Sequence, residues 1–122
     1  MQYLLLIYGS EANMKSATQA DMNAMMAEYG EFTASIVKSG HMKAGDALQP
    51  SSTATTVRVR DGKTLRTDGP FAETKEQLGG YYLVEAKDLD EATKLAAGIP
   101  GAKMGAIEIR PVMVLPTGYP RP

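Results

Sequence analysis

A continuous apolar run, from Tyr3 to Tyr8, constrains the fold of this 122-residue chain more than any other segment. Gly9 and Ser10 follow it and mark its end. Neighbouring side chains of a β-strand point to opposite faces, so an unbroken apolar run has two apolar faces. Such strands are typical of the centre of a sheet that is covered on both sides. We therefore expect residues 3–8 to form a central strand.

Two helices are expected after this strand. Thr18 and Asp21 can form a capping box at the start of the first, and Gly40 is a natural C′ residue at its end. Between them, apolar residues recur at three- and four-residue spacing and define one face: Met22, Met25, Met26, Tyr29, Phe32, Ile36 and Val37. Asp88 and Glu91 form a second capping box, which opens the shorter helix.

The other regular segments are strands. They are expected over residues 42–48, 53–60, 80–86 and 106–112. The order of the patterns is strand, helix, strand, hairpin, irregular loop, strand, helix, strand. This order fits an α+β fold, a ferredoxin-like split βαβ sheet with two helices on one face. The length favours a single domain, residues 1–122, in which 115–122 form a proline-rich extended tail.

The hairpin that turns at Asp61 and Gly62 allows two registers. A two-residue loop would place Leu65 opposite Arg58. A three-residue loop that ends at Gly62 would instead place Leu65 opposite Val57. We expect the second register, because it keeps the apolar side chains together on one face.

A sheet with both helices on one face leaves its other face open. Tyr81 and Tyr82 point to opposite faces, so one of them should line the open face beside apolar residues of the first strand. An exposed apolar face of that size usually finds a partner. We therefore expect a homodimer, sheet against sheet, with room between the sheets for a small-molecule ligand.

The composition argues against several classes of function. The absence of cysteine removes disulfides and thiolate chemistry and fits a reducing compartment. Thirteen basic and fourteen acidic residues are interleaved, so no basic block is available for nucleic acid. The first apolar run is too short to span a membrane and lacks the flanks of a signal peptide, so we expect a cytoplasmic protein. One histidine and scattered carboxylates give no metal-ligand spacing, and no cofactor fingerprint is present.

The segment 67–82 follows no regular pattern of strand or helix. Pro70 is suited to the first position of a helix, and Asp68 would be favoured near the start of that helix. Residues 73–77 could complete one or two turns, with Gly79 as the residue that ends them. One interpretation is therefore a capped short helix that joins two strands.

The same segment resembles a known protein family. The string Asp68-Gly69-Pro70-Phe71-Ala72-Glu73-Thr74-Lys75-Glu76, followed by Gly79-Gly80-Tyr81-Tyr82, is similar to the DGPF-domain branch of the YCII-related proteins. The similarity extends to Leu48-Gln49-Pro50, to residues 52–58 and to residues 108–112. It covers nearly the whole chain, and it is weakest over the first helix and the tail.

The resemblance implies a dimeric α+β barrel of ferredoxin-like subunits, with a cleft at the dimer interface and no settled reaction. It also implies an association with sigma factors of the extracytoplasmic-function type, because genes for such proteins often lie beside theirs. YCII proteins outside this branch carry a histidine on the first helix, paired with an aspartate as a suspected catalytic dyad. The only histidine of this chain, His41, lies beyond that helix, so the His–Asp mechanism does not carry over.

Asp68 and Glu73 are the main candidate catalytic residues. Two carboxylates held between glycines near an aromatic side chain could have separated pKa values and perform acid–base catalysis without a cofactor. Alternatively, Asp68 caps a helix and Glu73 faces water. His41 is a third candidate, as a base, although a histidine after Gly40 more often compensates the helix dipole. Asp46 could pair with His41 or could be a solvated turn residue.

Five residues are candidate ligand contacts. Arg58 and Lys75 could bind an anionic group. Phe71 is expected to pack under the loop as an anchor, and one of Tyr81 and Tyr82 should line the open face.

Two classes of function remain open. The first is a small enzyme that performs cofactor-free proton transfer, isomerisation or elimination in an interfacial cleft. The second is a non-catalytic ligand-binding or regulatory module that acts with a sigma factor. The sequence does not identify the ligand of either.

Overall fold

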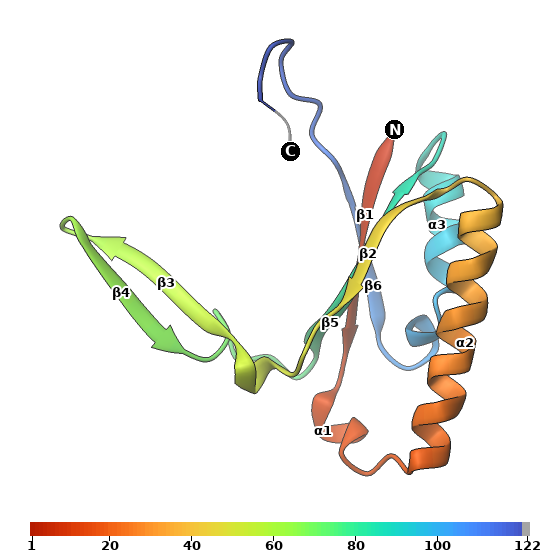
Figure 1. Ribbon diagram of the computed structural model, residues 1–122, viewed down its shortest axis with the longest axis horizontal. Coiled ribbons are helices and arrows are strands. Elements are labelled where there is room, and N and C mark those ends of the chain that lie inside the picture. The colour runs from red at the N-terminus through yellow and green to blue at the C-terminus, as the bar shows by residue number, and fades with distance from the viewer. Residues whose placement is uncertain (121–122) are drawn as a thin grey trace.

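The computed structural model describes residues 1–120 and shows a four-stranded sheet with two helices on one face (Figure 1). The strands of this sheet are β1 (Gln2–Gly9), β2 (Met42–Ala47), β5 (Gln77–Glu85) and β6 (Ala106–Pro111). The helices are α1 (Glu11–Met14), α2 (Gln19–Lys38) and α3 (Leu89–Gly98). A separate hairpin consists of β3 (Thr55–Arg60) and β4 (Lys63–Asp68). Two short 3₁₀ helices lie at Ser51–Thr53 and Pro100–Lys103.

The order of the strands in the main sheet is β2-β5-β1-β6, and each neighbouring pair is antiparallel. The strands joined by α2 are separated by β5, which is the split βαβ arrangement of a ferredoxin-like fold. The predicted fold class is therefore confirmed. The predicted central strand is also confirmed, because β1 pairs with β5 on one side and β6 on the other.

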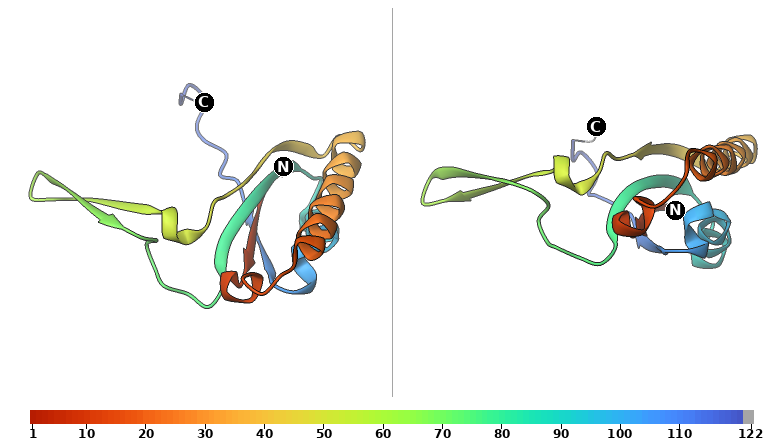
Figure 2. Two further views of the ribbon diagram at one scale, coloured as in Figure 1. Left: turned by 60° about the horizontal axis from the view of Figure 1, so that its bottom comes forward. Right: turned by 90° about the horizontal axis from the view of Figure 1, so that it is seen from below.

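The core lies between the sheet and the helices α2 and α3 (Figures 1 and 2). Leu5, Val84 and Ile99 are the largest fully buried side chains. Along β1, buried Tyr3 and Leu5 alternate with half-buried Leu4, whose side chain lies on the opposite face. Only one apolar face of β1 is therefore covered by the helices of its own chain.

The predicted limits of α2 agree with the structure. Thr18 caps the helix, and its hydroxyl and the Asp21 carboxylate form both hydrogen bonds of the capping box. The backbone N–H of Thr18 lowers the pKa of Asp21 below its usual value. Gly40 follows the helix with a φ of 82°, a conformation that favours glycine. Of the predicted apolar face, Ile36 is buried, whereas Val37 is 58% exposed.

The helix expected within the central segment is absent. Residues 69–76 form bends rather than a helix, and β5 already begins at Gln77, so Gly79 lies inside a strand. The Thr74 hydroxyl donates to the Glu76 carbonyl, and the Gln77 amide donates to the Thr74 carbonyl. Such local hydrogen bonds compete with helix formation, which explains why the predicted helical turns do not form.

The paired glycines instead bring two strands close together. A Cβ atom on Gly80 would lie 2.8 Å from the carbonyl oxygen of Asp46 on β2. A Cβ atom on Gly79 would have 4.0 Å to its nearest neighbour, the carbonyl oxygen of Ile7. Glycine is therefore required at position 80 by the contact between β2 and β5, but not at position 79.

The predicted register of the hairpin is wrong. Asp61 and Gly62 form a two-residue turn, with φ angles of 51° and 74°, and Leu65 lies opposite Arg58. Positive φ at both positions is the geometry of a type I′ turn, which suits Asp-Gly and matches the twist of the strands. The expectation that apolar residues align across the hairpin assumed a buried face. Val57 is 59% exposed, so burial does not set the register.

The hairpin projects from the sheet on the side opposite the helices (Figures 1 and 2). We call residues 55–71 the arm, which comprises β3, β4 and the three residues that follow them. The predicted tail, residues 115–122, contains neither helix nor strand as far as Pro120, and its last two residues lie outside the described part. Within residues 1–120, no helix has both the length and the apolar character needed to cross a membrane.

Candidate functional site

The open face of the sheet carries an apolar floor with a polar group on either side. Leu4 and Leu6 of β1 and Leu83 of β5 form the floor and are half-buried. Alternation along the strands places Tyr81 on this face and Tyr82 on the opposite one. Apolar residues with a few convergent polar groups are typical of small-molecule sites.

Asp46 and Tyr81 form the first polar group. They are direct neighbours in the register of β2 and β5, and the Tyr81 hydroxyl donates to Oδ2 of Asp46 over 2.6 Å. This hydrogen bond and the negative charge of Asp46 raise the pKa of Tyr81 above its usual value. The phenol therefore stays protonated at neutral pH, beside a carboxylate that can accept a proton.

The second polar group comprises Tyr8, Glu108 and Arg110. The Tyr8 hydroxyl donates to Oε1 of Glu108 over 3.3 Å, and Nε of Arg110 donates to Oε2 over 2.9 Å. The hydrogen bond from Arg110 is the main cause that lowers the pKa of Glu108. Glu108 is therefore a stable anion whose two oxygens are already engaged, which makes it a positioning group rather than a base.

The predicted ligand residues Arg58 and Phe71 lie together on the arm. The guanidinium carbon of Arg58 is 5.6 Å from the centroid of the Phe71 ring, which is a cation–π distance. Phe71 is 80% exposed, so the expectation that it packs under the loop is wrong.

The predicted catalytic residues Asp68 and Glu73 are exposed, as is Lys75. Asp68 ends β4, and the other two lie in the irregular segment that follows. Among residues 1–120, none of the three side chains makes a hydrogen bond or an ion pair. Their roles in catalysis and ligand binding stay predictions.

Tyr82 belongs to the core. Its hydroxyl lies 2.7 Å from the Thr33 hydroxyl, and its ring meets that of Phe32 edge to face, with centroids 5.3 Å apart. The side chain is 7% exposed and lies on the helix side of the sheet. Of the two tyrosines proposed from the sequence, Tyr81 is therefore the one on the open face.

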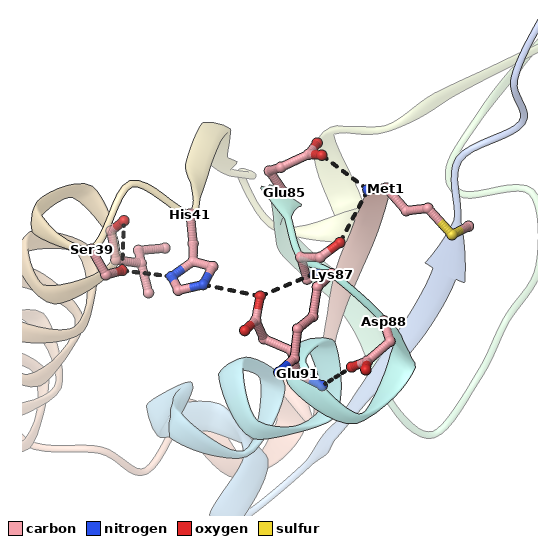
Figure 3. Close-up of polar contacts among 9 residues, drawn as sticks. Met1, Ser39, His41, Glu85, Lys87, Asp88 and Glu91 are labelled. Atoms are coloured by element: carbon pink, nitrogen blue, oxygen red, sulfur yellow. Dashed lines mark hydrogen bonds and ion pairs between the residues drawn. The ribbon is translucent and has the colours of Figure 1, made fainter.

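His41 lies on the helix side, in a chain of polar contacts (Figure 3). Its Nδ1 is 2.6 Å from the Ser39 hydroxyl, and its Nε2 is 3.2 Å from Oε1 of Glu91. The partner suggested by the sequence, Asp46, is hydrogen-bonded to Tyr81 instead. The Lys87 backbone N–H is the main cause that lowers the pKa of Glu91, and His41 contributes.

This Ser–His–Glu series has the residue types of a nucleophilic site but not its electrostatics. The Ser39 hydroxyl donates to the carbonyl of Ile36 and lies at the carboxyl end of α2. The negative end of a helix dipole opposes the developing oxyanion of acyl transfer. The contacts of Ser39, His41 and Glu91 tie the end of α2 to the start of α3.

A groove of about 790 Å³ runs between α2 and α3 beside this series. Phe32, Ile36 and Leu95 are among the apolar residues that line it, and the Lys103–Glu28 ion pair, 3.5 Å long, lies at its rim. It is open to solvent, and the acids among its lining residues are Glu28 and Glu31 of α2. No group of three metal-ligating side chains occurs within residues 1–120.

The fold and the open face define a ferredoxin-like α+β protein with an uncovered apolar sheet face. The chain belongs to the YCII-related domain family, whose family model matches residues 1–116. An uncharacterized protein of Rhizobium meliloti (strain 1021) is 33% identical over 120 residues, 97% of each chain. The family prediction is thus confirmed, while the assignment to the DGPF branch stays a prediction.

A comparison with solved structures finds 5-chloro-2-hydroxyhydroquinone dehydrochlorinase from Burkholderia phenoliruptrix, in complex with 2,5-dihydroxybenzoquinone. It has 13% sequence identity and a TM-score of 0.49, covering 93% of this chain and 94% of the other.

The sequence alone could not identify the Asp46–Tyr81 pair. The two residues are 35 positions apart, and their contact depends on the register between β2 and β5. The available signal was the alternation that places one of the adjacent tyrosines on the open face.

Proposed function

We propose that this YCII-related protein binds a small molecule on the open face of its sheet, and that Asp46 and Tyr81 exchange a proton with it. The observation that carries this proposal is the 2.6 Å hydrogen bond between the two side chains, beside an apolar floor that the chain leaves uncovered. No cofactor is needed for such a reaction.

A second copy of the chain completes the site. The floor of Leu4, Leu6 and Leu83 is too apolar to face water without cost, and a twofold pairing of sheets would cover it. The ligand then lies between the two sheets, with an apolar body on the floor and a polar end at Asp46. Water is largely excluded from such a space, which strengthens the polar contacts.

The chemistry follows from the two protonation states. Asp46 accepts a proton from an acidic C–H or O–H group of the ligand. Once Asp46 holds that proton, the Tyr81 phenol turns its own O–H from Asp46 to the ligand oxygen on which negative charge develops. Return of the proton to another position gives isomerisation, and loss of a leaving group gives elimination. Asp68 and Glu73 are the alternative acids.

The test is a thermal-shift screen against a library of small carbonyl and hydroxylated organic acids. We expect compounds that raise the unfolding midpoint of the wild type to lose this effect in D46N, and to lose part of it in Y81F. The matched controls D68N and E73Q should respond as the wild type does. If D46N and Y81F keep every shift while D68N or E73Q loses it, the ligand site lies at Asp68 or Glu73 and this proposal fails.

Turnover separates an enzyme from a binding module. Each compound that binds is incubated with the protein in deuterated water and examined by NMR. Exchange of a ligand hydrogen for deuterium, or conversion of the ligand, supports proton transfer if it requires Asp46. Binding with no exchange or conversion would leave the ligand-binding function and exclude the catalytic part.

A further inference from the structure

The arm is the part of the molecule least covered by the rest of the chain. Every residue of β4 is exposed, and in β3 only Thr56 is half-buried. A two-stranded hairpin alone is at best marginally stable in water. An arm with this geometry therefore needs a covering surface in solution.

Three side chains on one face of the arm suit an interface. The two-residue turn sets Leu65 opposite Arg58, and Arg58 in turn lies over the ring of Phe71. We call these three residues the anchor cluster. Leu65 is 47% and Phe71 80% exposed. Aromatic and arginine side chains supply most of the binding energy at the centre of interfaces, so this cluster has the chemistry of a docking surface.

The direction and length of the arm indicate what it can reach. Figure 2 shows it leaving the sheet on the open side, away from α2 and α3. Each strand of the arm has six residues. At about 3.3 Å per residue the arm extends roughly 20 Å, whereas two packed sheets lie only about 10 Å apart. If a second copy covers the open face, the arm must extend alongside that copy.

The charges favour one docking point. On the open face, Glu85 pairs with the amino group of Met1, and Glu108 pairs with Arg110. Asp46 takes part in none of the ion pairs formed within residues 1–120. Its hydrogen bond comes from the neutral Tyr81 phenol. The arm carries four cations and two acids. An arginine from outside the chain would complement Asp46.

We propose that the arm is exchanged between two copies of the chain, so that the anchor cluster of one copy docks at Asp46 of the other and Arg58 pairs with that carboxylate. The inference rests on the proposed ligand site and adds that each site is built from two chains. A ligand that binds at Asp46 and Tyr81 of one copy displaces Arg58 of the other copy from the carboxylate, which frees Asp46 to act as a base. The ligand is then flanked by Arg58 and Phe71, which favours an organic anion with a planar apolar part.

Substitutions in the anchor cluster test the exchange. L65D and F71S change exposed side chains, so each chain should still fold. Loss of a residue at the energetic centre of an interface raises the dimer dissociation constant by about thirtyfold or more. Sedimentation velocity over a range of concentrations measures this change. V59D is the matched control, because Val59 is 61% exposed on the opposite face of the same arm, and it should dimerise as the wild type does.

A charge exchange tests the contact with Asp46. R58E should weaken dimerisation, and the double variant R58E/D46R should restore it, because the reversed pair is again complementary. A mixture of R58C and D46C chains should form a crosslink between chains with a short bis-maleimide, since the native chain has no cysteine to interfere. R58C mixed with V37C, on the helix side, is the control and should not crosslink.

Several results would overturn the inference. It fails if L65D and F71S dimerise as the wild type does, or if V59D weakens dimerisation as much as they do. It also fails if D46R does not restore dimerisation to R58E, or if R58C crosslinks to V37C. These results are distinct from failure of the ligand site, which the thermal-shift response of Y81F decides, because Tyr81 takes no part in the contact between Arg58 and Asp46.

Discussion

Glu91 shows how one carboxylate connects two elements. It accepts hydrogen bonds from the Lys87 backbone N–H over 3.1 Å and from His41, and these contacts lower its pKa below the usual 4.5. A lowered pKa in the folded state stabilises the protein above the unfolded-state pKa, and the effect is lost as the pH falls through the folded-state pKa. E91Q should therefore be less stable than the wild type at pH 7, with the difference shrinking below about pH 4.5.

The measurement for E91Q is urea unfolding at a series of pH values. D90N is the control, because Asp90 lies in the same first turn of α3 but contacts neither Lys87 nor His41. A wild-type advantage that stayed constant down to pH 3 would contradict the assignment. The predicted capping box is half formed: Asp88 accepts from the Glu91 backbone N–H, but the Glu91 carboxylate accepts from Lys87 instead of Asp88. The sequence did not predict the contact of Glu91 with His41, since it depends on how the start of β2 and α3 meet.

At the scale of elements, the contact between β2 and β5 depends on Gly80. A Cβ atom there would meet the Asp46 carbonyl oxygen at 2.8 Å, on backbone that cannot move without disturbing the sheet. G80A should therefore lower the free energy of unfolding by about 1–3 kcal/mol, as overpacking does. G79A, where the nearest atom is 4.0 Å away, should leave stability unchanged or slightly higher. Equal losses for both variants in chemical unfolding would contradict this explanation.

The elements that the sequence predicted correctly are those with a buried face. The apolar run of β1 and the alternation around Ile107 and Ile109 of β6 reflect packing against one core. The capping box marks the start of α2, which packs against the same core. The failures, the register of the arm and the helix expected over 73–77, lie in segments whose side chains are almost all exposed. There, turn chemistry at Asp61 and Gly62 and hydrogen bonds of local side chains decide the conformation.

For the whole molecule, the helices cover one face of the sheet, while the arm projects on the other side (Figure 1). The alternation along β1 and β5 places the apolar floor on that other side as well. The ligand candidates are divided in the same way: Tyr81 and Asp46 on the sheet, Arg58 and Phe71 on the arm. In the proposed assembly their meeting depends on a second chain, so no pattern within one sequence could indicate it. A single chain therefore displays the parts of the proposed site without assembling them.

The proposed assembly links stability to concentration. If two chains fold and associate together, each tenfold rise in protein concentration stabilises the dimer by about 1.4 kcal/mol, which raises the unfolding midpoint of a dimer of two such chains by roughly 2–4 °C. We expect this dependence for the wild type and for V37D, whose altered residue lies on α2 away from the open face. L65D, which should be monomeric at low concentration, should lose the dependence there. Scanning calorimetry over a hundredfold range of concentration measures it. A wild-type midpoint that does not change over that range would mean that the open face is not covered by a second copy.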